Sequence, residues 1–457
     1  MPTHLIPFAK RWCRSARHSL VTRVWLCVAM TLLLASHSAH ATPAYARQTG
    51  SPCADCHAGA YGPALTPYGI RFKLNGYTDT GGKGSSIPAA VQLIGTHTVP
   101  TRGDNTTQLT EADLYLAGRI TDHVGGYVKV ETDNTGNDHF HTKLSNVDIR
   151  YVAKELKMGG HDTTLGVSVN NSPGFEDPIG ALPNAANFGP PAISGTLLNP
   201  SSPNALATRV IGAVAYGVLD SNWLGAVGTY MAMPRSTQSD FGYRPSDDPG
   251  KLSGTGYLRL AYMKEFKHQF FSAGVVGLTT KRKLPRNARE DDITDLGYDL
   301  TYQFIGNREH IVQLSYVNIL EQRDYGSTFA APFAPGLLTK SHVAAHDQTL
   351  GLTYTFKQSY GITLAYLKST GSRDPVRYPP YGDPATTSQL ITLFWAPFGK
   401  EDSWLPFANL KLAATWFRFT KFNGVRNNIF GVAPGLGAPV TNARDLDQFS
   451  ISASVAF

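Results

Sequence analysis

The sequence predicts an all-β protein, a transmembrane antiparallel β-barrel of about 16 strands that follows a short, partly helical N-terminal segment. Three observations predict this fold. Charged residues make up only 16% of the 457 residues, while the chain contains 44 Gly, 22 Phe and 21 Tyr. Several stretches alternate between apolar and small or polar residues, which is typical of strands. The connections between these stretches are alternately short and long, as in outer-membrane barrels.

Residues 1–41 have the features of a secretory signal peptide. They contain five basic residues and no acidic residue, an apolar run over 24–35, and Ala39-His40-Ala41 as a cleavage site. The run is too short to span a membrane as a helix, so an uncleaved anchor is the weaker alternative. A second A-x-A string at 44–46 leaves the cut site open. The remaining chain has 36 basic and 34 acidic residues, a formal charge of +2, which gives no reason to expect nucleic-acid binding.

The mature chain keeps two cysteines, both in the string Cys53-Ala54-Asp55-Cys56-His57. This is the C-x-x-C-H attachment signature of c-type haem, in which two thiols form thioethers and the histidine ligates the iron. We therefore expect one covalent haem c held by Cys53 and Cys56, with His57 as the proximal iron ligand. A chance match and a redox-active disulfide are the alternatives, and the absence of a surrounding βαβ pattern disfavours the disulfide.

Residues 42–88 form the predicted haem-bearing segment. Thr66 as N-cap, Pro67 in the first turn and Gly76 at the exit predict a helix over 67–75. Tyr68 and Phe72 would share one face of this helix and cover the haem. A segment of this size is marginal for a core of its own, so we expect it to pack against a larger body.

The second axial ligand of the iron is not obvious from the sequence. Residues 42–88 contain no Met and no His besides His57, so a strong ligand must come from elsewhere, or the iron stays five-coordinate or takes a weak ligand. Strand parity points Met263 into the lumen and puts His97 on the face of Val91 and Leu93, a candidate lipid-facing side. Both are candidate distal ligands, and each is also compatible with plain packing. Arg71 and Lys73 are candidates for binding the haem propionates, or are solvated.

Residues 89–457 form the predicted barrel. Strands are expected to start near residues 89, 112, 124, 144, 163, 209, 222, 256, 269, 294, 310, 348, 360, 388, 408 and 447. Long connections are expected at 170–208, 232–255, 279–293, 321–347, 369–387 and 423–446. A soluble β-sandwich is the alternative, but the loop pattern and the terminal Phe457 favour an outer-membrane barrel. An even number of strands would place both termini in the periplasm.

The external loops offer weak candidates for an electron-donor site. The loop over 131–141, which includes Glu131, Asp133, His139 and His141, provides oxygen and imidazole ligands that iron accepts. Glu176 and Asp177 in the next long loop are similar. Polar loops often have this composition without binding a metal.

The sequence resembles the fused monohaem cytochrome–porins of the outer membrane, the ferrous-iron oxidases of iron-oxidising bacteria. The resemblance is carried by residues 46–57, which end in the C-x-x-C-H string, and more softly by 68–77, 169–178 and 421–424. It implies that extracellular ferrous iron donates an electron to haem c, which passes it to a periplasmic c-type cytochrome. It thus implies an iron(II):cytochrome c oxidoreductase set in outer-membrane lipid.

Other functions remain open from the residues alone. The chain is a candidate for a conduit with another donor, or for one that runs outward to an insoluble acceptor, because nothing in the sequence fixes the direction of flow. It is also a candidate for a diffusion porin whose haem segment forms a plug.

Overall fold

A computed structural model describes residues 44–81, 88–134, 139–182, 195–200, 205–326, 341–405, 408–433 and 439–457. The predicted signal peptide over 1–41 lies outside the described residues. All described residues belong to one compact unit, Thr42–Phe457.

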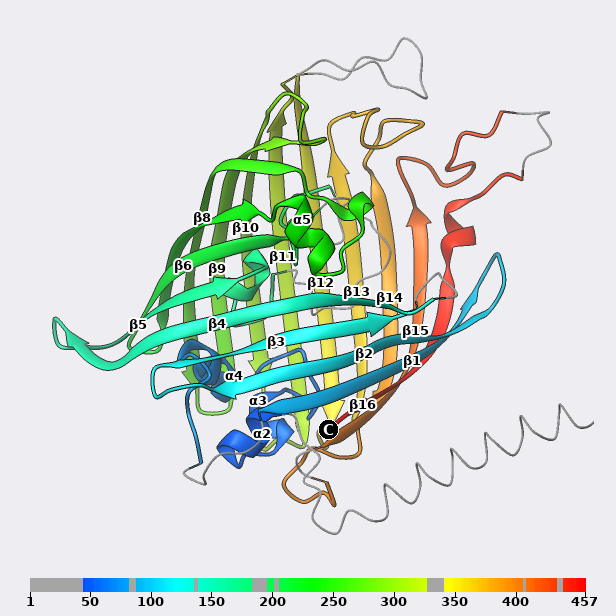
Figure 1. Ribbon diagram of the computed structural model, residues 1–457. Coiled ribbons are helices and arrows are strands. Elements are labelled where there is room, and N and C mark those ends of the chain that lie inside the picture. The colour runs from blue at the N-terminus through cyan, green and yellow to red at the C-terminus, as the bar shows by residue number, and fades with distance from the viewer. Residues whose placement is uncertain are drawn as a thin grey trace, which may run out of the picture. The chain divides into compact units, whose positions relative to one another are not determined.

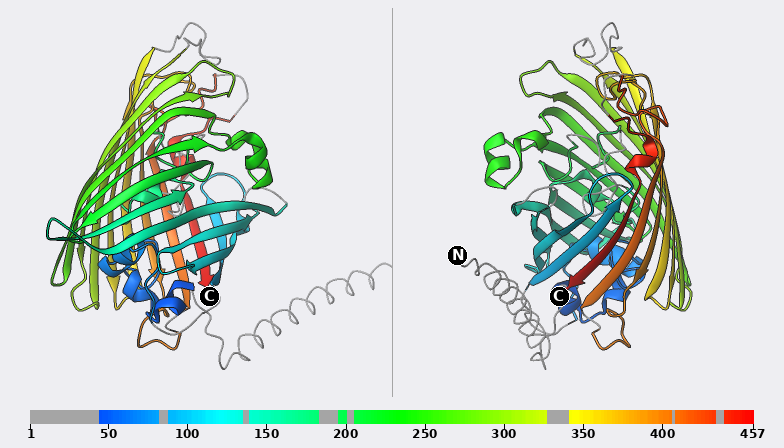
Figure 2. Two further views of the ribbon diagram at one scale, coloured as in Figure 1. Left: turned by 60° about the vertical axis from the view of Figure 1, so that its left-hand side comes forward. Right: turned by 90° about the vertical axis from the view of Figure 1, so that its right-hand side faces the viewer.

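Sixteen strands in the described residues form one closed antiparallel barrel, which confirms the predicted fold class (Figures 1 and 2). Each strand pairs with its neighbours in sequence, and β1 closes the barrel against β16. Two backbone hydrogen bonds between Val91 and Phe457, of 2.7 and 2.9 Å, begin this closure. The strands are β1 (Ala89–Pro100), β2 (Thr106–Arg119), β3 (Val124–Asp133), β4 (His141–Met158), β5 (His161–Asn170), β6 (Val210–Leu219), β7 (Trp223–Ala232), β8 (Lys251–Phe266), β9 (Gln269–Lys283), β10 (Asp291–Phe304), β11 (His310–Asp324), β12 (His342–Phe356), β13 (Tyr360–Gly371), β14 (Thr386–Trp395), β15 (Asn409–Lys421) and β16 (Gln448–Ala456).

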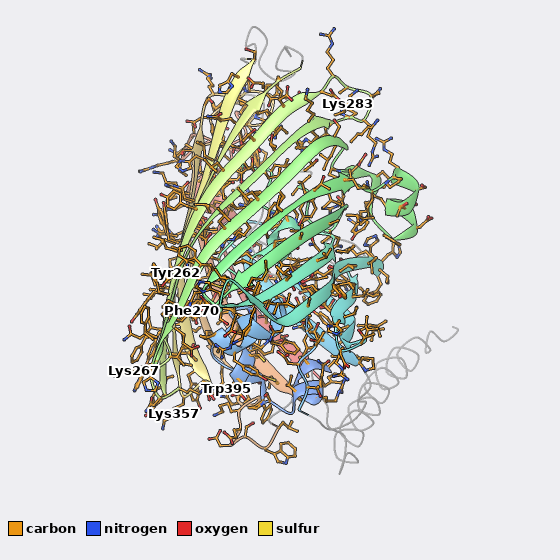
Figure 3. All side chains as sticks on the ribbon, turned by 90° about the vertical axis from the view of Figure 1, so that its left-hand side faces the viewer. Tyr262, Lys267, Phe270, Lys283, Lys357 and Trp395 are labelled. Carbon is orange, nitrogen blue, oxygen red and sulfur yellow. The ribbon has the colours of Figure 1, made fainter. Side chains whose placement is uncertain are left out.

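Alternation along each strand separates an apolar outer face from the lumen. In β10, Leu296 is 62% exposed on the outside, whereas Asp295 and Asp299 are fully buried on the inside. Outward aromatic residues such as Tyr262 and Trp395 lie toward one end of the barrel (Figure 3). An apolar outer surface with aromatic residues near its edge is the surface that a transmembrane barrel presents to lipid.

The two ends of the barrel differ in their connections. One end, here called the terminal end, holds the start of β1, the end of β16 and mostly short turns, such as those at Lys267 and Lys357 (Figure 3). The other end, here called the loop end, carries most of the long connections, including 171–209 and 325–341. The connection from β14 to β15, over 396–408, is the long exception at the terminal end. This alternation agrees with the predicted loop pattern.

Among the described residues, three short helices precede the barrel: α2 (Ala44–Thr49), α3 (Cys53–Cys56) and α4 (Pro67–Leu74). The predicted helix over 67–75 is confirmed as α4, in which Thr66 Oγ1 accepts a hydrogen bond from the Gly69 amide at 3.3 Å. The chain leaves α4 through Gly76, whose φ of +68° suits a residue without a side chain. Helix α5 (Arg235–Asp240) and the 3₁₀ turns η1 (Pro173–Glu176), η2 (Pro245–Asp247) and η3 (Ala443–Leu446) lie in connections between strands. No helix among the described residues is both long and apolar enough to cross a membrane.

The N-terminal segment 44–81, here called the plug, lies at the terminal end of the barrel (Figures 1 and 2). Ile70 and Leu74 of α4 join a hydrophobic core with inward side chains of β6 to β11, among them Val214, Leu224 and Val276. The lumen on this side is therefore apolar and packed, not lined by small and polar residues as the alternation had suggested. The barrel supplies the core that so short a segment cannot form alone.

The opposite side of the lumen is polar and accessible. Hydroxyl residues form a row across neighbouring strands, here called the hydroxyl belt, and all of them are half-buried: Thr353, Thr363, Thr392, Thr415 and Ser450. Two pairs in the belt are hydrogen-bonded at 3.0 Å. By contrast, Ser272 and Thr301 on the inner face of β9 and β10 are buried.

Candidate functional site

The C-x-x-C-H string forms helix α3 and the residue after it, inside the plug. Its backbone is fixed from two sides: the Ala54 amide donates to the Gly399 carbonyl at 2.9 Å, and the Thr66 amide donates to the Cys56 carbonyl at 2.9 Å. Helix α4 crosses close behind it, since a Cβ added at Gly69 would lie 3.1 Å from the carbonyl carbon of Cys56. Glycine at position 69 thus permits α4 to contact the backbone of α3 directly.

Both cysteines are free thiols, Cys53 buried and Cys56 half-buried. Burial raises the pKa of Cys53 to about 11, and burial together with Asp55 raises the pKa of Cys56 to about 12. Redox-active C-x-x-C pairs instead have a lowered thiol pKa, because the thiolate is the reactive form. The environment therefore disfavours the redox-disulfide alternative, and two unpaired thiols one helical turn apart fit covalent attachment of a haem.

His57 provides a neutral imidazole. Burial lowers the pKa of His57 to about 4, so the ring has a free lone pair at neutral pH. Its Nδ1 is buried and has no hydrogen-bond partner among the described residues. The ring packs against Gly62, where an added Cβ would lie 3.1 Å from Cε1. A buried, unprotonated ring nitrogen without a protein partner fits a ligand to haem iron.

The wall holds the plug by hydrogen bonds from several directions. Gln303 Nε2 of β10 donates to the Leu65 carbonyl at 2.8 Å, Asn409 Nδ2 of β15 donates to the Ala60 carbonyl at 2.6 Å, and Tyr216 of β6 donates to the Leu74 carbonyl at 2.9 Å. Charged pairs add to these at the terminal mouth, namely Arg71 with Glu265 and Arg308 with Asp55. The attachment residues are therefore held at a defined place within the barrel.

An aromatic cluster joins the plug to β3 and to the loop after β5. Tyr45 stacks on Tyr77 with ring centroids 5.2 Å apart, and Phe72 meets Tyr77 edge-on at 5.8 Å. Tyr127 of β3 contacts both Tyr77 and Phe175. Of the two residues expected to cover the haem, Phe72 is thus committed to this cluster, whereas Tyr68 is 36% exposed.

The long loop after β5 folds into the lumen, so the expectation that Glu176 and Asp177 face the outside is wrong. Both are buried, and each meets an arginine of the wall: Arg150 lies 3.6 Å from Glu176, and Arg259 lies 3.1 Å from Asp177. Arg259 also binds Asp299. Carboxylates buried in ion pairs are not available to an external metal ion.

The loop over 131–141 is described only in part, because residues 135–138 lie outside the described residues. Glu131 and Asp133 both bind Lys143, at 2.8 and 3.2 Å. Glu111, Asp113 and Glu131 lie close enough together to hold a metal ion, but Lys129 Nζ is 2.7, 3.0 and 3.1 Å from their oxygens. The lysine ammonium therefore occupies the position that a metal ion would take.

The two candidate distal ligands occupy different faces of the wall. Met263 is 2% exposed and belongs to the core that includes Ile70 and Leu74, which agrees with its predicted inward direction. His97 is exposed on the outer face, and its Nδ1 lies 2.7 Å from Thr107 Oγ1. His97 thus points away from the lumen, and Met263 is the one of the two that faces the plug.

The two residues of α4 that are candidates for binding the haem propionates contact other groups of the protein. Arg71 binds Glu265 at the mouth of the barrel. Lys73 lies over the ring of Phe175, 5.9 Å from its centroid, and burial followed by repulsion from Arg150 lowers its pKa to about 8.

Sequence reasoning missed the residues that contact the plug, including Gly399 of the connection after β14, which binds Ala54, and Asn409 and Lys411 of β15, which contact Ala60 and Tyr61. The inward parity of Asn409, Lys411, Ala413 and Thr415 along β15 was a usable signal, because outward residues between them are apolar. The sequence did not indicate which plug residue each of them contacts.

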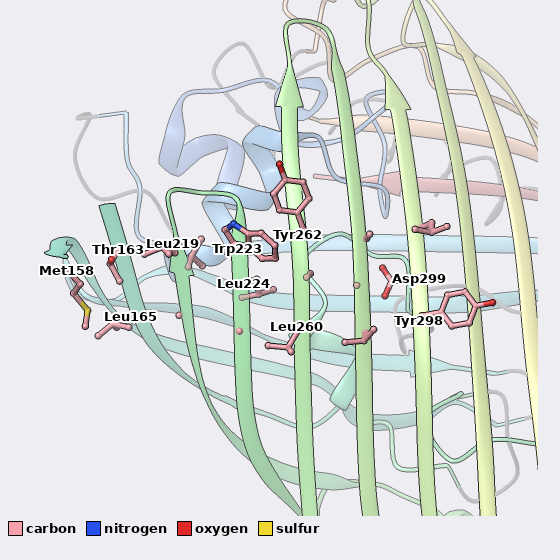
Figure 4. Close-up of a pocket in the computed structure, with 18 residues that line it drawn as sticks. Met158, Thr163, Leu165, Leu219, Trp223, Leu224, Leu260, Tyr262, Tyr298 and Asp299 are labelled. Carbon is pink, nitrogen blue, oxygen red and sulfur yellow. The ribbon is translucent and has the colours of Figure 1, made fainter. Parts of the chain in front are cut away.

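An apolar groove of about 760 Å³ lies on the wall where small residues of β6, β7 and β9 leave space between larger ones (Figure 4). Leu165, Trp223 and Leu260 border it. None of its lining residues belongs to the plug, so the groove is not part of the candidate haem site.

No protein-family model matches the sequence, and no curated protein matches it. Among solved structures, the barrel is similar to OmpT of Vibrio cholerae, with 12% identity, a TM-score of 0.43, and coverage of 81% of this chain and 98% of the other. OmpF of Salmonella typhi has 10% identity, a TM-score of 0.46 and coverage of 81% and 97%. An anion-selective porin from Comamonas acidovorans has 10% identity, a TM-score of 0.44 and coverage of 81% and 98%. These similarities concern the fold alone.

Proposed function

We propose that the chain is an outer-membrane electron conduit. It takes electrons from extracellular ferrous iron through one covalent haem c and delivers them to a periplasmic c-type cytochrome. The observation that carries the proposal is the position of Cys53, Cys56 and His57, which lie in the plug at the terminal end of a closed barrel, where Ala54 binds Gly399 of the β14–β15 connection and Ala60 binds Asn409 of β15. A cofactor bound there would lie at one mouth of a barrel that crosses an otherwise insulating layer.

The residues of the site have defined roles in this proposal. Cys53 and Cys56 hold the cofactor covalently, and His57 supplies a neutral nitrogen to the iron. When bound, the haem supplies a one-electron centre. The packed core around Ile70 and Leu74 keeps the plug in place, so that electron transfer requires no movement of the protein.

The two sides of the lumen give the donor and the acceptor separate approaches. The half-buried hydroxyl belt gives the lumen a polar surface that suits a small hydrated ion. The plug sits at the terminal end, where the short turns and both ends of the barrel chain lie. In outer-membrane barrels short turns face the periplasm, and this supports the proposal that the haem donates to a periplasmic acceptor.

The test is reduction of the haem by ferrous iron. The protein is reconstituted in liposomes with an oxidised soluble c-type cytochrome inside, ferrous iron is added outside, and the absorbance of both haems is followed. We expect the barrel haem and then the enclosed cytochrome to become reduced. A C53A/C56A variant, which keeps the barrel, is the control. A wild-type protein that carries no haem by peroxidase staining, or a haem that stays oxidised, would refute the proposal.

A diffusion porin is the second candidate, and the accessible hydroxyl belt is the observation that favours it. The two functions differ in what crosses the membrane. Liposome swelling with small sugars measures solute passage directly. Rapid swelling together with a haem that ferrous iron does not reduce would favour the porin.

A further inference from the structure

Lys411 is a cation in the lumen that has no acidic partner in the part of the chain that the structure describes. It lies on the inner face of β15 and is half-buried. Five other buried or half-buried cations bind a carboxylate: Lys129, Lys143, Arg150, Arg259 and Arg377. Among the described residues, no carboxylate oxygen lies within ion-pair distance of Lys411. Its Nζ instead lies 4.9 Å from the ring centroid of Phe394 and 5.4 Å from that of Tyr61.

The position of Lys411 relates it to the haem segment. Asn409, two residues earlier on the same inner face, binds the Ala60 carbonyl at 2.6 Å, three residues after His57. Ser454, the cross-strand partner of Lys411, contacts the hydroxyl of Tyr61, which also accepts a hydrogen bond from Gln92 at 2.8 Å. Lys411 thus lies where the turn after His57 meets the wall.

A haem attached through Cys53 and Cys56 has its two thioethers on one edge and carboxylates on another. The carboxylates need a cationic partner if they are shielded from water. The lysine and arginine of α4 are less suitable partners. Arg71 already binds Glu265, and Lys73 lies in the field of Asp148 and Glu176.

We propose that Lys411 binds the carboxylate edge of the haem carried by the plug. This inference rests on the proposed function. Lys411 is then a positioning residue, which fixes the orientation of the haem and places a positive charge beside it. A nearby cation stabilises the reduced haem, because reduction removes one positive charge from the iron. The same lysine would attract a soluble anion, so the test must separate these two sources of negative charge.

The experiment measures the haem midpoint potential of the purified holoprotein at pH 7, together with haem content per protein. The variants are K411M, which removes the charge, K411R, which keeps it, and K357M. Lys357 is an exposed lysine in a turn at the same end of the barrel, so K357M is the matched control. We expect K411M to retain its haem and to have a lower potential, whereas K411R and K357M keep the wild-type potential.

Each unfavourable outcome has a distinct meaning. A K411M protein with full haem content and the wild-type potential would overturn the role of Lys411 and leave the proposed function intact. Wild-type protein without covalent haem would instead refute the proposed function. Titration with phosphate and chloride tests whether Lys411 binds a soluble anion instead of the haem carboxylates. A saturable change in the wild-type potential that K411M abolishes would show that it does, and would also overturn the proposal.

Discussion

Gly69 provides a sharp test of how the haem segment is packed. In the middle of a helix, replacing glycine by alanine normally stabilises by about 1 kcal/mol. Here the added Cβ would lie 3.1 Å from the carbonyl carbon and 3.2 Å from the Cα of Cys56, well below an ordinary carbon–carbon contact of about 3.5–4.0 Å. The neighbour is backbone, and it is held by hydrogen bonds on both sides, so it cannot rotate away.

We expect G69A to be destabilising overall. Overpacking of a tight interior costs about 1–3 kcal/mol. Over most of this range, the cost is larger than the gain in helix propensity. The net loss is then up to about 2 kcal/mol, which corresponds to an increase of up to about 30-fold in the open population of the segment. The buried thiol of Cys53 reports that population, because it is shielded while the segment is closed and reacts when the segment opens.

The measurement is the rate of Cys53 alkylation in C56A protein produced without haem and folded in detergent. Labelling is carried out under conditions in which closing is faster than the chemical step, so that the rate follows the open fraction. G277A is the control, since an added Cβ at Gly277 has no heavy atom within 4 Å. Labelling of G69A at or below the wild-type rate would refute the described packing of α4 on Cys56.

Three further predictions follow from buried charges and from the lumen. The folded-state pKa of Lys73 is lowered from 10.5 to about 8, which means that folding favours its neutral form. Thermal stability should therefore rise as the pH increases from 8 toward 10.5, and the K73M variant should lack this rise. R259M should cost about 3–5 kcal/mol in urea unfolding, because it leaves buried carboxylates unpaired, and adding D299N should recover part of the loss. In proteoliposomes, a small hydrophilic thiol reagent should label T415C in the hydroxyl belt but not S272C on the packed side; equal labelling of both would contradict the asymmetric lumen.

The barrel was predictable because its signals are local. Outward and inward positions alternate along a strand, so the apolar residues at 296–304 indicate both the strand and its lipid-facing side. The helix α4 was predictable for the same reason, since Thr66 and Pro67 mark its start within the segment itself. The attachment string Cys53-x-x-Cys56-His57 is also contiguous, and so the candidate site was found without knowledge of the fold.

The interior arrangement was not predictable, because it depends on contacts between residues far apart in sequence. Glu176 and Asp177 have the composition of an exposed loop, and only the buried Arg150 and Arg259 of the wall explain why they fold inward. Period-two alternation also fails to tell a wet lumen from a packed one. Inward Val214 occupies the same parity as a polar lumen residue would, and its burial depends on α4.

The asymmetry of the lumen links the fold to the proposed chemistry. A plug that filled the whole barrel would exclude the donor. A plug in an otherwise open barrel would have no core to pack against. Here α4 and the inward loop fill the side formed by β6 to β11, where the wall is apolar. The other side keeps its hydroxyl belt accessible. The turn after His57 reaches this second side through Asn409 and the neighbours of Lys411, so the packed half holds the segment while the attachment site borders the accessible half.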